Sequence, residues 1–247
     1  MNKQTIFIIP VRMASTRLPN KPLVLIDDKP MIQHVFERTR DAGLGPVLVA
    51  CDHPDVASII EKAGGHFIMT DPNLPSGSDR IYQALMQYDE NGQYEQIVNV
   101  QGDLPTTSKD VLEACLLPLN NHEVDIATLA TPIHSLSERD DPNVVKIALT
   151  KKEAASCARA LYFSRASIPY GTDTCYHHVG LYAYRRKALC DFINLPPSPL
   201  EQTERLEQLR ALEAGMTIGI GFIESAPWGV DTESDLERVR CHMDSNK

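Results

Sequence analysis

The sequence predicts an α/β fold with a mainly parallel mixed sheet flanked by helices. Short apolar runs with few charges, typical of buried strands, alternate with segments whose apolar residues recur at helical spacing. Glycine and proline residues separate these segments. A chain that alternates strand and helix builds a parallel sheet through right-handed crossovers. The length of 247 residues suffices for one large α/β domain or two small ones.

The first half of the chain gives the clearest elements. We expect strands over 6–11, 46–51, 67–70 and 96–101, and helices over 30–42, 54–63 and 78–88. Pro30 suits a first helical turn, Gly43 suits a helix end, and Ser78 is the expected N-cap of the third helix.

The second half is less regular. We expect strands over 125–131, 144–149, 161–164, 179–184 and 217–223, and helices over 201–214 and 231–243. Asp231 or Thr232 is the expected cap of the last helix. The charged loop 135–143 is expected to be mobile. We interpret residues 1–247 as one domain, with a nucleotide-binding core over about 1–124 and 216–247 and a smaller substrate part over about 125–215.

Composition excludes several classes of protein. Asp and Glu number 33 against 24 Lys and Arg, and this acidic balance argues against a general nucleic-acid binder. The six cysteines form no CxxC pair, which favours reduced thiols in a cytoplasmic protein over a zinc site or disulfide framework. No apolar run approaches the roughly 18 residues of a membrane span.

A cluster of cations and hydroxyls follows the first strand. Arg12, Arg17 and Lys21 supply fixed positive charge, and Ser15 and Thr16 supply hydroxyl groups. Ligands of open α/β sheets bind at the carboxyl ends of the strands, where this segment lies. Such a set of donors is typical of a polyphosphate site. A solvated basic loop remains the alternative on composition alone.

Two aspartates are candidates for a metal site. Asp103 follows the fourth strand beside a glycine, and Asp231 lies in the sequence Trp-Gly-Val-Asp-Thr. Two carboxylates beside triphosphate oxygens suit Mg²⁺. A turn former for Asp103 and an N-cap for Asp231 are the alternatives, and sequence spacing leaves open whether the two residues meet.

Seven stretches of the chain, in order, resemble the 3-deoxy-manno-octulosonate cytidylyltransferase (CMP-Kdo synthetase) family. They are Ile-Pro-Val-Arg-Met-Ala-Ser-Thr-Arg-Leu-Pro-Asn-Lys-Pro-Leu over 9–23 and the segments 76–80, 98–103, 162–169, 178–185, 198–210 and 229–232. Together they span nearly the whole chain. The resemblance implies a nucleotide-diphosphosugar transferase-like fold, usually as a homodimer, with a smaller substrate and dimerisation subdomain.

The resemblance also implies roles for individual residues. The expected catalytic residues are Arg12, Lys21, Asp103 and Asp231, with the two aspartates holding Mg²⁺. The expected nucleotide contacts are Arg12, Ser15, Lys21, Ser76, Gly77, Asp79, Arg80 and Gln101. The expected sugar contacts are Arg165, His178, Tyr182, Glu207 and Gln208. For Glu207 and Gln208, a solvated helix surface would be the interpretation without the resemblance.

The implied reaction activates 3-deoxy-D-manno-octulosonate (Kdo) with CTP, giving CMP-Kdo and pyrophosphate for lipopolysaccharide biosynthesis. The anomeric hydroxyl attacks the α-phosphate in line, and Mg²⁺ on Asp103 and Asp231 lowers the pKa of that hydroxyl. For His178 we favour an orienting hydrogen bond over a role as base, and His177 is expected to face solvent.

Three features depart from the family pattern. Leu104 replaces a common glutamate, Asn20 replaces a common glycine, and the segment 170–177 is short. They leave open the 8-amino analogue of Kdo, another acidic sugar such as sialic acid, or a non-catalytic nucleotide-binding relative. A Rossmann dehydrogenase is disfavoured, because Gly215, Gly219 and Gly221 lack the GxGxxG spacing.

Overall fold

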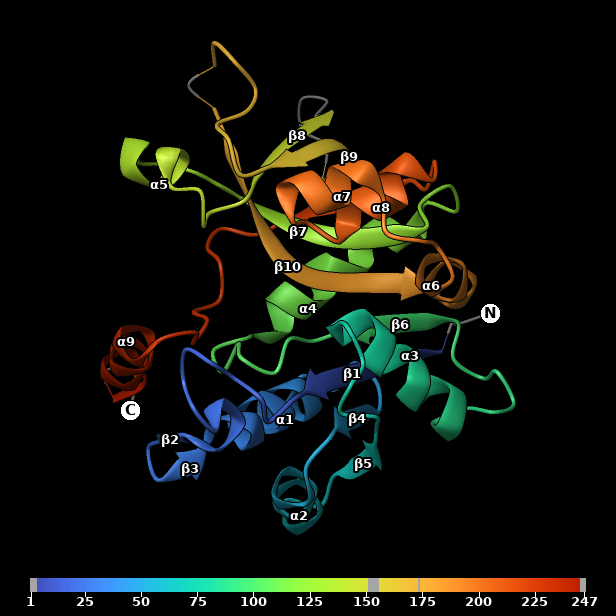
Figure 1. The fold of residues 1–247 in the computed structure, drawn as a ribbon, viewed down its shortest axis with the longest axis vertical. Helices are drawn as coiled ribbons and strands as arrows, with labels where there is room; N and C mark the ends of the chain where they lie inside the picture. Colours follow the sequence, from blue (N-terminus) through green and yellow to red (C-terminus); the bar gives the residue numbers. More distant parts are fainter. Residues whose placement is uncertain (1–3, 151–155, 173, 245–247) are drawn as a thin grey trace. The chain divides into compact units, whose positions relative to one another are not determined.

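The computed structural model describes residues 4–150, 156–172 and 174–244 (Figure 1). The chain forms two compact units, the first comprising residues 1–112 and 227–247 and the second residues 113–226. One boundary falls within α4 (Lys109–Leu116). The sequence placed the boundaries near 124 and 216. The division into nucleotide and sugar parts remains a prediction about function.

The first unit contains a parallel sheet with strand order β5-β4-β1-β6 in its described residues. The strands are β1 (Thr5–Val11), β4 (Val47–Cys51), β5 (His66–Met69) and β6 (Gln96–Asn99). All four were expected from their apolar runs, although β6 ends two residues earlier. β1 and β4 are almost wholly buried, as expected for strands covered on both faces.

Three helices connect these strands, namely α1 (Met31–Asp41), α2 (Pro54–Lys62) and α3 (Gly77–Tyr88). From β1 the chain moves outward through β4 to β5, and then returns to the other side of β1 at β6. Right-handed crossovers therefore place α1 and α2 on one face and α3 on the other. The reversal beside β1 creates the position where open α/β sheets bind ligands.

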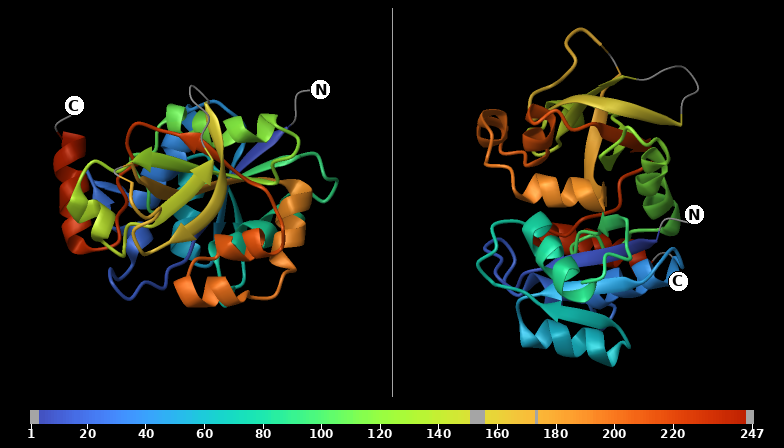
Figure 2. Two further views of the ribbon diagram at one scale, coloured as in Figure 1. Left: turned by 90° about the horizontal axis from the view of Figure 1, so that it is seen from above. Right: turned by 90° about the vertical axis from the view of Figure 1, so that its right-hand side faces the viewer.

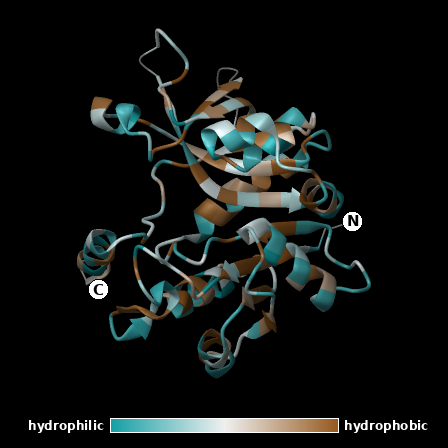
Figure 3. Ribbon diagram, viewed as in Figure 1, coloured by the Kyte–Doolittle hydropathy of each residue, from teal (hydrophilic) through white to brown (hydrophobic). Residues whose placement is uncertain are grey.

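Helix α2 shows why these segments are helical. Val56, Ala57 and Ile60 are buried, whereas the charged Glu61 and Lys62 are exposed. The ribbon of α2 therefore carries both brown (hydrophobic) and teal (hydrophilic) segments in Figure 3. The helix packs beside β5 (Figure 2). Pro54 occupies its first turn, where a missing N–H costs nothing.

Two helix starts differ from the sequence prediction. The Ser76 hydroxyl accepts a bond of 3.2 Å from the backbone N–H of Asp79, so Ser76 caps α3. The prediction that Ser78 is the cap was wrong, because Ser78 lies buried inside the first turn. Pro30 is not in the first turn of α1. It belongs to β3 (Lys29–Pro30), which pairs with β2 (Leu25–Ile26).

The C-terminal segment returns to the first unit through a small hydrophobic core. This core joins the loop after β1, the β2–β3 hairpin, α1 and α9 (Glu233–Asp244), and consists of Leu18, Ile26, Met31, Val230, Leu236 and Val239. Arg240 also donates to the carbonyl of Leu25 at 2.8 Å. The segment before α9 is thereby held beside the loop that follows β1.

The second unit has a mixed sheet of order β10-β7-β11-β9-β8 in its described residues. The strands are β7 (Ile126–Pro132), β8 (Lys146–Thr150), β9 (Cys157–Ser164), β10 (Tyr176–Arg185) and β11 (Ile218–Phe222). β7 and β11 are parallel, and the other described pairings are antiparallel. Because β11 pairs with β7 and β9, it belongs to this unit and not to the first.

The helices of the second unit correct several predictions. They are η2 (Leu117–Asn120), α5 (Leu136–Asp140), α6 (Arg186–Ile193), α7 (Pro199–Glu204) and α8 (Gln208–Glu213). A further short helix, η1 (Lys21–Leu23), belongs to the first unit. The loop 135–143, expected to be mobile, contains α5, which Ser135 caps. α4 and α6 were not predicted. None of the helices in the described residues has the length and apolar character needed to cross a bilayer.

The predicted helix over 201–214 is two helices. Arg205 has a left-handed backbone (φ 56°), which ends α7. The guanidinium of Arg210 then binds both carboxylate oxygens of Glu201, at 2.8 and 2.6 Å. This bidentate pair links α8 to α7 and outweighs the continuous helical pattern of the sequence.

Gly219 and Gly221 allow the chain to pack closely against β11. A Cβ on Gly221 would lie 2.0 Å from the carbonyl oxygen of Ala114, and one on Gly219 would lie 2.6 Å from the Cβ of Pro118. These glycines therefore serve packing, which agrees with their unsuitable spacing for a dinucleotide loop.

We predict that Gly221→Ala destabilises the protein by about 2–3 kcal/mol, because the backbone of Ala114 must move to admit a methyl group. Gly180→Ala is the matched control in β10, where a Cβ would meet no atom within 4 Å. Thermal denaturation measures both. Equal melting temperatures for the two variants would contradict the close approach.

Candidate active site

A cavity of about 480 Å³ opens at the carboxyl edge of the first unit's sheet. The loop after β1, the start of α3 and the loop after β6 line it. Most of the predicted nucleotide-binding and catalytic residues line it as well, namely Arg12, Ser15, Lys21, Ser76, Gly77, Arg80, Gln101, Asp103 and Asp231. Asp79 does not line the cavity. Its carboxylate instead accepts a bond of 2.6 Å from the Ser76 hydroxyl.

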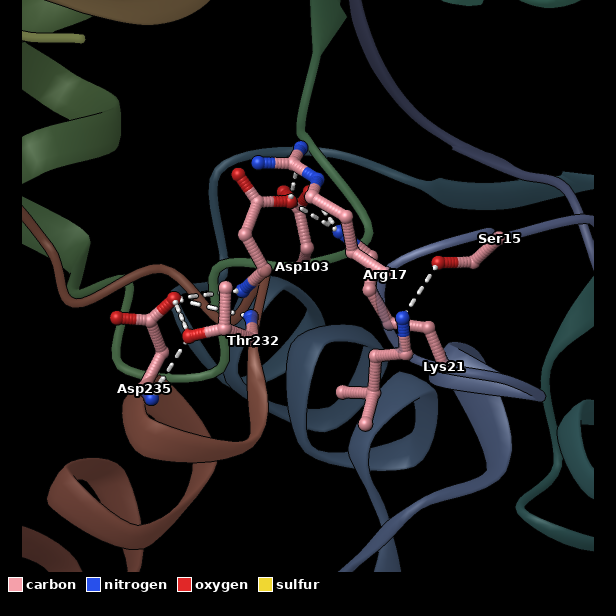
Figure 4. A network of polar contacts seen from close by, with 8 residues as sticks. Ser15, Arg17, Lys21, Asp103, Thr232 and Asp235 are labelled. Atoms are coloured by element: carbon pink, nitrogen blue, oxygen red, sulfur yellow. Dashed lines mark hydrogen bonds and ion pairs between the residues drawn. The ribbon is translucent and has the colours of Figure 1, made fainter.

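Lys21 joins the two predicted metal-binding aspartates. Its Nζ atom lies 2.6 Å from Oδ2 of Asp103 and 2.9 Å from Oδ1 of Asp231. Figure 4 shows Lys21 reaching Asp103 from the loop after β1. The three residues are far apart in sequence, so the fold alone decides that Asp103 and Asp231 meet.

The environment of Lys21 keeps it charged. Burial by itself would lower the pKa of the Lys21 ammonium, but the charges and hydrogen bonds of Asp103 and Asp231 outweigh burial and raise the pKa. At neutral pH the ammonium therefore remains protonated, as a role in phosphate binding requires.

The cavity carries an excess of positive charge. Arg12, Arg17, Lys21 and Arg80 line it together with the carboxylates of Asp103 and Asp231. Arg17 is mostly exposed and lies 3.2 Å from Oδ1 of Asp231. The N-terminus of α3, where Ser76 and Gly77 line the cavity, adds the positive end of a helix dipole. This combination suits a polyphosphate.

Asp231 does not cap the last helix. The hydroxyl of Thr232 accepts a bond from the N–H of Asp235, and the Asp235 carboxylate accepts bonds from the N–H groups of Asp231 and Thr232 at 3.2 and 3.0 Å. This capping box leaves the Asp231 carboxylate to face Lys21. Thr232 and Asp235 appear beside the site in Figure 4. Of the two predicted caps, Thr232 is correct.

Backbone contacts align the two aspartates. The N–H of Val230 donates to the carbonyl of Asp103 at 3.0 Å. The N–H of Trp228 donates to the hydroxyl of Thr106 at 2.7 Å. The segment 228–231 thus lies along the loop after β6, which fixes Asp231 next to Asp103.

The residues that depart from the family pattern fit this local structure. Asn20 has φ 54° and ψ 31°, so a left-handed residue is required there, and asparagine tolerates that conformation. Leu104 does not line the cavity. Its Cδ2 lies 3.4 Å from the position of a Cβ on Gly229, so it packs beneath the segment that carries Asp231.

The carboxylate pair fits a magnesium ion. Asp103 and Asp231 converge on one cation, the Lys21 ammonium, which shows that their oxygens reach a common point. Within residues 4–150, 156–172 and 174–244, no cluster of three or more His, Cys, Asp or Glu side chains is arranged for a metal. Mg²⁺ is usually held by one or two carboxylates together with substrate phosphates and water, so this donor set suits it.

Sequence reasoning missed Asp52. This buried aspartate follows β4, so its carboxylate lies at the same sheet edge as Asp103, and that position was the available signal. One of its oxygens accepts the N–H of Met13 at 2.9 Å, and the other lies 3.3 Å from a guanidinium nitrogen of Arg80.

The predicted sugar contacts belong to the second unit. The Arg165 guanidinium donates to the backbone carbonyls of Glu204 and Pro142, at 2.9 and 3.0 Å. The Glu204 carboxylate accepts the backbone N–H of Arg165 and the hydroxyl of Ser164. Arg165 is therefore firmly positioned between β9 and the end of α7.

His178 and Gln208 are buried in this unit and lie beside the partly exposed Tyr182. The rings of His178 and Tyr182 lie 5.6 Å apart, and the Gln208 amide is 3.5 Å from Nδ1 of His178. The Thr128 hydroxyl is 3.0 Å from Nε2 of His178 and 2.8 Å from the carbonyl of Leu181. Because that hydroxyl donates to the carbonyl, we assign the ring proton to Nε2.

Burial disfavours charge on these side chains. It lowers the pKa of His178 to about 3, with a smaller contribution from His177, and it raises the pKa of Tyr182. An imidazole with so low a pKa is a weak base, which fits the orienting role that we favoured. Glu207 adds to the raised pKa of Tyr182. Contrary to expectation, His177 is half-buried and lies 3.5 Å from the carboxylate of Glu138.

Comparison with known proteins decides the family. The model for the family described as Cytidylyltransferase matches residues 6–218. A 3-deoxy-manno-octulosonate cytidylyltransferase of Rhodospirillum centenum is 49% identical over 98% of this chain and 94% of its own length. That of Brucella anthropi is 53% identical over 96% of this chain and 95% of its own. The chain belongs to the 3-deoxy-manno-octulosonate cytidylyltransferase family. It is thus an enzyme of the nucleotidyltransferase class.

Solved structures agree with this assignment. CMP:2-keto-3-deoxy-manno-octonic acid synthetase, in a structure complexed with CTP, matches with a TM-score of 0.91 and 37% identity over 99% of this chain and 100% of that one. A cytidylyltransferase from Leptospira borgpetersenii is 15% identical, with a TM-score of 0.65 over 99% of this chain and 88% of that one, and shows the shared α/β fold alone.

We predict that His178 makes folding stability fall with decreasing pH. Between pH 6.5 and 3 the unfolded chain binds a proton that the folded imidazole does not, so stability falls by up to roughly 1.4 kcal/mol per pH unit in that window. His178→Gln removes this contribution. Urea unfolding at pH 7 and 5 measures it, with the exposed His122→Gln as control. An unchanged pH slope in His178→Gln would contradict the burial of a neutral ring.

Proposed function

We propose that this enzyme transfers the cytidylyl group of CTP to 3-deoxy-D-manno-octulosonate, releasing pyrophosphate. The observation that carries the proposal is the convergence of Lys21, Asp103 and Asp231 in a cationic cavity at the switch point of the parallel sheet. Membership in the family supplies the choice of nucleotide and sugar.

The reaction is a displacement at phosphorus. The anomeric hydroxyl oxygen of the sugar forms a bond to the α-phosphorus, and the bond from that phosphorus to the bridging oxygen breaks with its electron pair leaving on pyrophosphate. The hydroxyl proton passes to solvent. Positioning and charge neutralisation are expected to supply most of the rate, as in other phosphoryl transfers.

The cationic side chains have separate tasks in this proposal. Arg12 and Lys21 neutralise the charge that grows on pyrophosphate, since both line the cavity and the pKa of Lys21 is raised. Ser15 can donate its hydroxyl proton to a phosphate oxygen while its hydroxyl oxygen accepts the N–H of Leu18 at 3.3 Å.

The cytidine part of CTP is assigned to the wall of the same cavity that α3 and the loop after β6 form. Ser76, Gly77 and Arg80 at the start of α3 and Gln101 after β6 line that wall and present donors and acceptors for ribose and base. The amide of Gln101 is fixed by Asn99, whose side-chain oxygen accepts from it at 3.2 Å. We no longer assign a direct contact to Asp79, because its carboxylate is bound to the Ser76 hydroxyl.

Asp103 and Asp231 are the proposed holders of Mg²⁺. When bound, Mg²⁺ would neutralise phosphate charge and acidify the attacking hydroxyl. Asp103 and Asp231 would hold the ion, and Lys21, which pairs with both carboxylates in this structure, would then be available to a phosphate group. No dedicated side-chain base is then required.

The sugar is assigned to side chains of the second unit. Arg165 would pair with the sugar carboxylate, and His178, Tyr182, Glu207 and Gln208 would hydrogen-bond its hydroxyls. The pKa of His178, lowered to about 3, makes its imidazole a weak base, which favours orientation over proton abstraction. We also propose a cytoplasmic homodimer that serves lipopolysaccharide biosynthesis, on the strength of the family resemblance.

Pyrophosphate release from CTP with Mg²⁺ tests this function, with Kdo, the 8-amino analogue of Kdo and sialic acid offered in parallel. We expect turnover with Kdo. Turnover with only one of the other sugars would keep the chemistry and change the substrate. Silence with all three sugars, accompanied by tight CTP binding, would favour the non-catalytic alternative.

We predict that Asp103→Asn and Asp231→Asn each lower kcat by at least about 100-fold, because each removes one of two carboxylates that neutralise charge in the transition state. Asp55→Asn, on the exposed start of α2, is the control and should retain full activity. Steady-state rates at saturating CTP, Kdo and Mg²⁺ measure the effect. Near-normal turnover in either purified variant would remove that residue from the site.

A further inference from the structure

We propose that Asp52 is a positioning residue of the nucleotide site, which acts by fixing the guanidinium of Arg80 at the wall of the cavity and the backbone where the loop after β1 begins. The inference rests on the proposed use of CTP. Asp52 does not itself line the cavity, so its effect on the nucleotide passes through Arg80 and Met13.

Both oxygens of Asp52 are engaged. Oδ1 accepts the N–H of Met13 at 2.9 Å, directly after Arg12, and Oδ2 lies 3.3 Å from Nη2 of Arg80. One carboxylate thus holds two neighbouring walls of the cavity. It ties the loop after β1 to α3.

The Asp52–Arg80 pair is deeply buried. Only 6% of the Asp52 side chain and 3% of the Arg80 side chain are exposed. A buried charge without a counterion is strongly disfavoured, so Arg80 requires a partner in this position. Within the part of the chain that the structure describes, Asp52 supplies the carboxylate that pairs with Arg80.

Arg80 is further fixed by its second contact. Its Nη1 donates to the hydroxyl of Thr70, and that hydroxyl donates to the carbonyl of Cys51 at 3.1 Å. Thr70 also donates its N–H to the same carbonyl at 2.8 Å. The guanidinium is therefore oriented by the carboxyl ends of both β4 and β5.

The neighbouring cation makes a counterion more important. Burial lowers the pKa of Arg80, Asp52 opposes that effect, and the charge of Arg12 adds to it. Arg12 and Arg80 both line the cavity, so their charges repel one another when no nucleotide is bound. Asp52 supplies the negative charge that allows two arginines to face a single ligand.

Asp52→Asn tests the proposal with little change in shape. The amide oxygen still accepts the N–H of Met13, but an NH₂ group then faces the Arg80 guanidinium, donor against donor. We expect the KM for CTP to rise about tenfold, a loss of about 1.4 kcal/mol, with the KM for Kdo changed less than about twofold. Equal effects on both KM values, or none on CTP, would overturn the proposal.

The matched control is Asp89→Asn. Asp89 is also buried in the first unit, with 3% exposure, and accepts the N–H groups of Gln93 and Tyr94 at 2.9 and 3.0 Å. It does not line the cavity. We expect Asp89→Asn to lower the melting temperature and leave the KM for CTP unchanged. If Asp89→Asn raised the KM for CTP as much as Asp52→Asn does, general destabilisation would explain the effect of Asp52→Asn, against the proposal.

A second pair of variants isolates the route through Arg80. In an Arg80→Met background no buried guanidinium remains, so adding Asp52→Asn should raise the KM for CTP no further. This comparison holds even when Asp52→Asn alone fails to fold. A further tenfold rise in the double variant would show that Asp52 acts independently of Arg80, against the proposal.

Calorimetric titration of the wild-type enzyme with CTP separates the two levels of inference. Wild-type protein that neither binds CTP nor releases pyrophosphate refutes the proposed function. Wild-type protein that binds CTP and turns over, together with an Asp52→Asn variant of unchanged CTP affinity, refutes only the role of Asp52.

Discussion

The ammonium of Lys21 between Asp103 and Asp231 is the contact on which the site depends. Two ionised carboxylates that lie close together repel one another, so a cation between them stabilises the arrangement of the segments that carry them. Lys21 supplies that cation when no ligand is bound, at 2.6 and 2.9 Å. In the proposed function, the same two carboxylates would hold a metal ion and the same ammonium would bind phosphate.

This contact is maintained by packing outside the cavity. The small core around Leu18, Met31 and Leu236 docks α9 against the loop after β1 and the β2–β3 hairpin. The Thr232–Asp235 capping box satisfies the start of α9 without the Asp231 side chain. Hydrophobic docking therefore brings the C-terminal segment to the site, and local hydrogen bonding leaves its carboxylate available for chemistry.

Charge balance in the first unit is organised at the carboxyl ends of neighbouring strands. Asp52 after β4 serves Arg80, and Asp103 after β6 serves Lys21. In each pair an aspartate at the sheet edge orients a cation that lines the cavity. The parallel sheet makes this possible, since its strands all end at one edge. In the second unit, by contrast, burial keeps the imidazole of His178 neutral.

Much of the fold and many of the residues that line the cavity were predictable from sequence. Apolar runs located β1, β4, β5 and β6, and the resemblance in seven ordered stretches indicated Arg12, Lys21, Asp103 and Asp231. These predictions depend on local pattern or on family motifs, which a sequence contains directly.

Other features were decided only by tertiary structure. The helix over 201–214 breaks at Arg205 because the Arg210–Glu201 pair joins α8 to α7, and periodicity does not contain that contact. Asp52 escaped notice because its partners, Met13 and Arg80, are distant in sequence. The sequence by itself determined which side chains carry charge and which segments form strands. The long-range packing determined which charges meet, because the free energy of an ion pair depends on distances and burial that exist only in the folded chain.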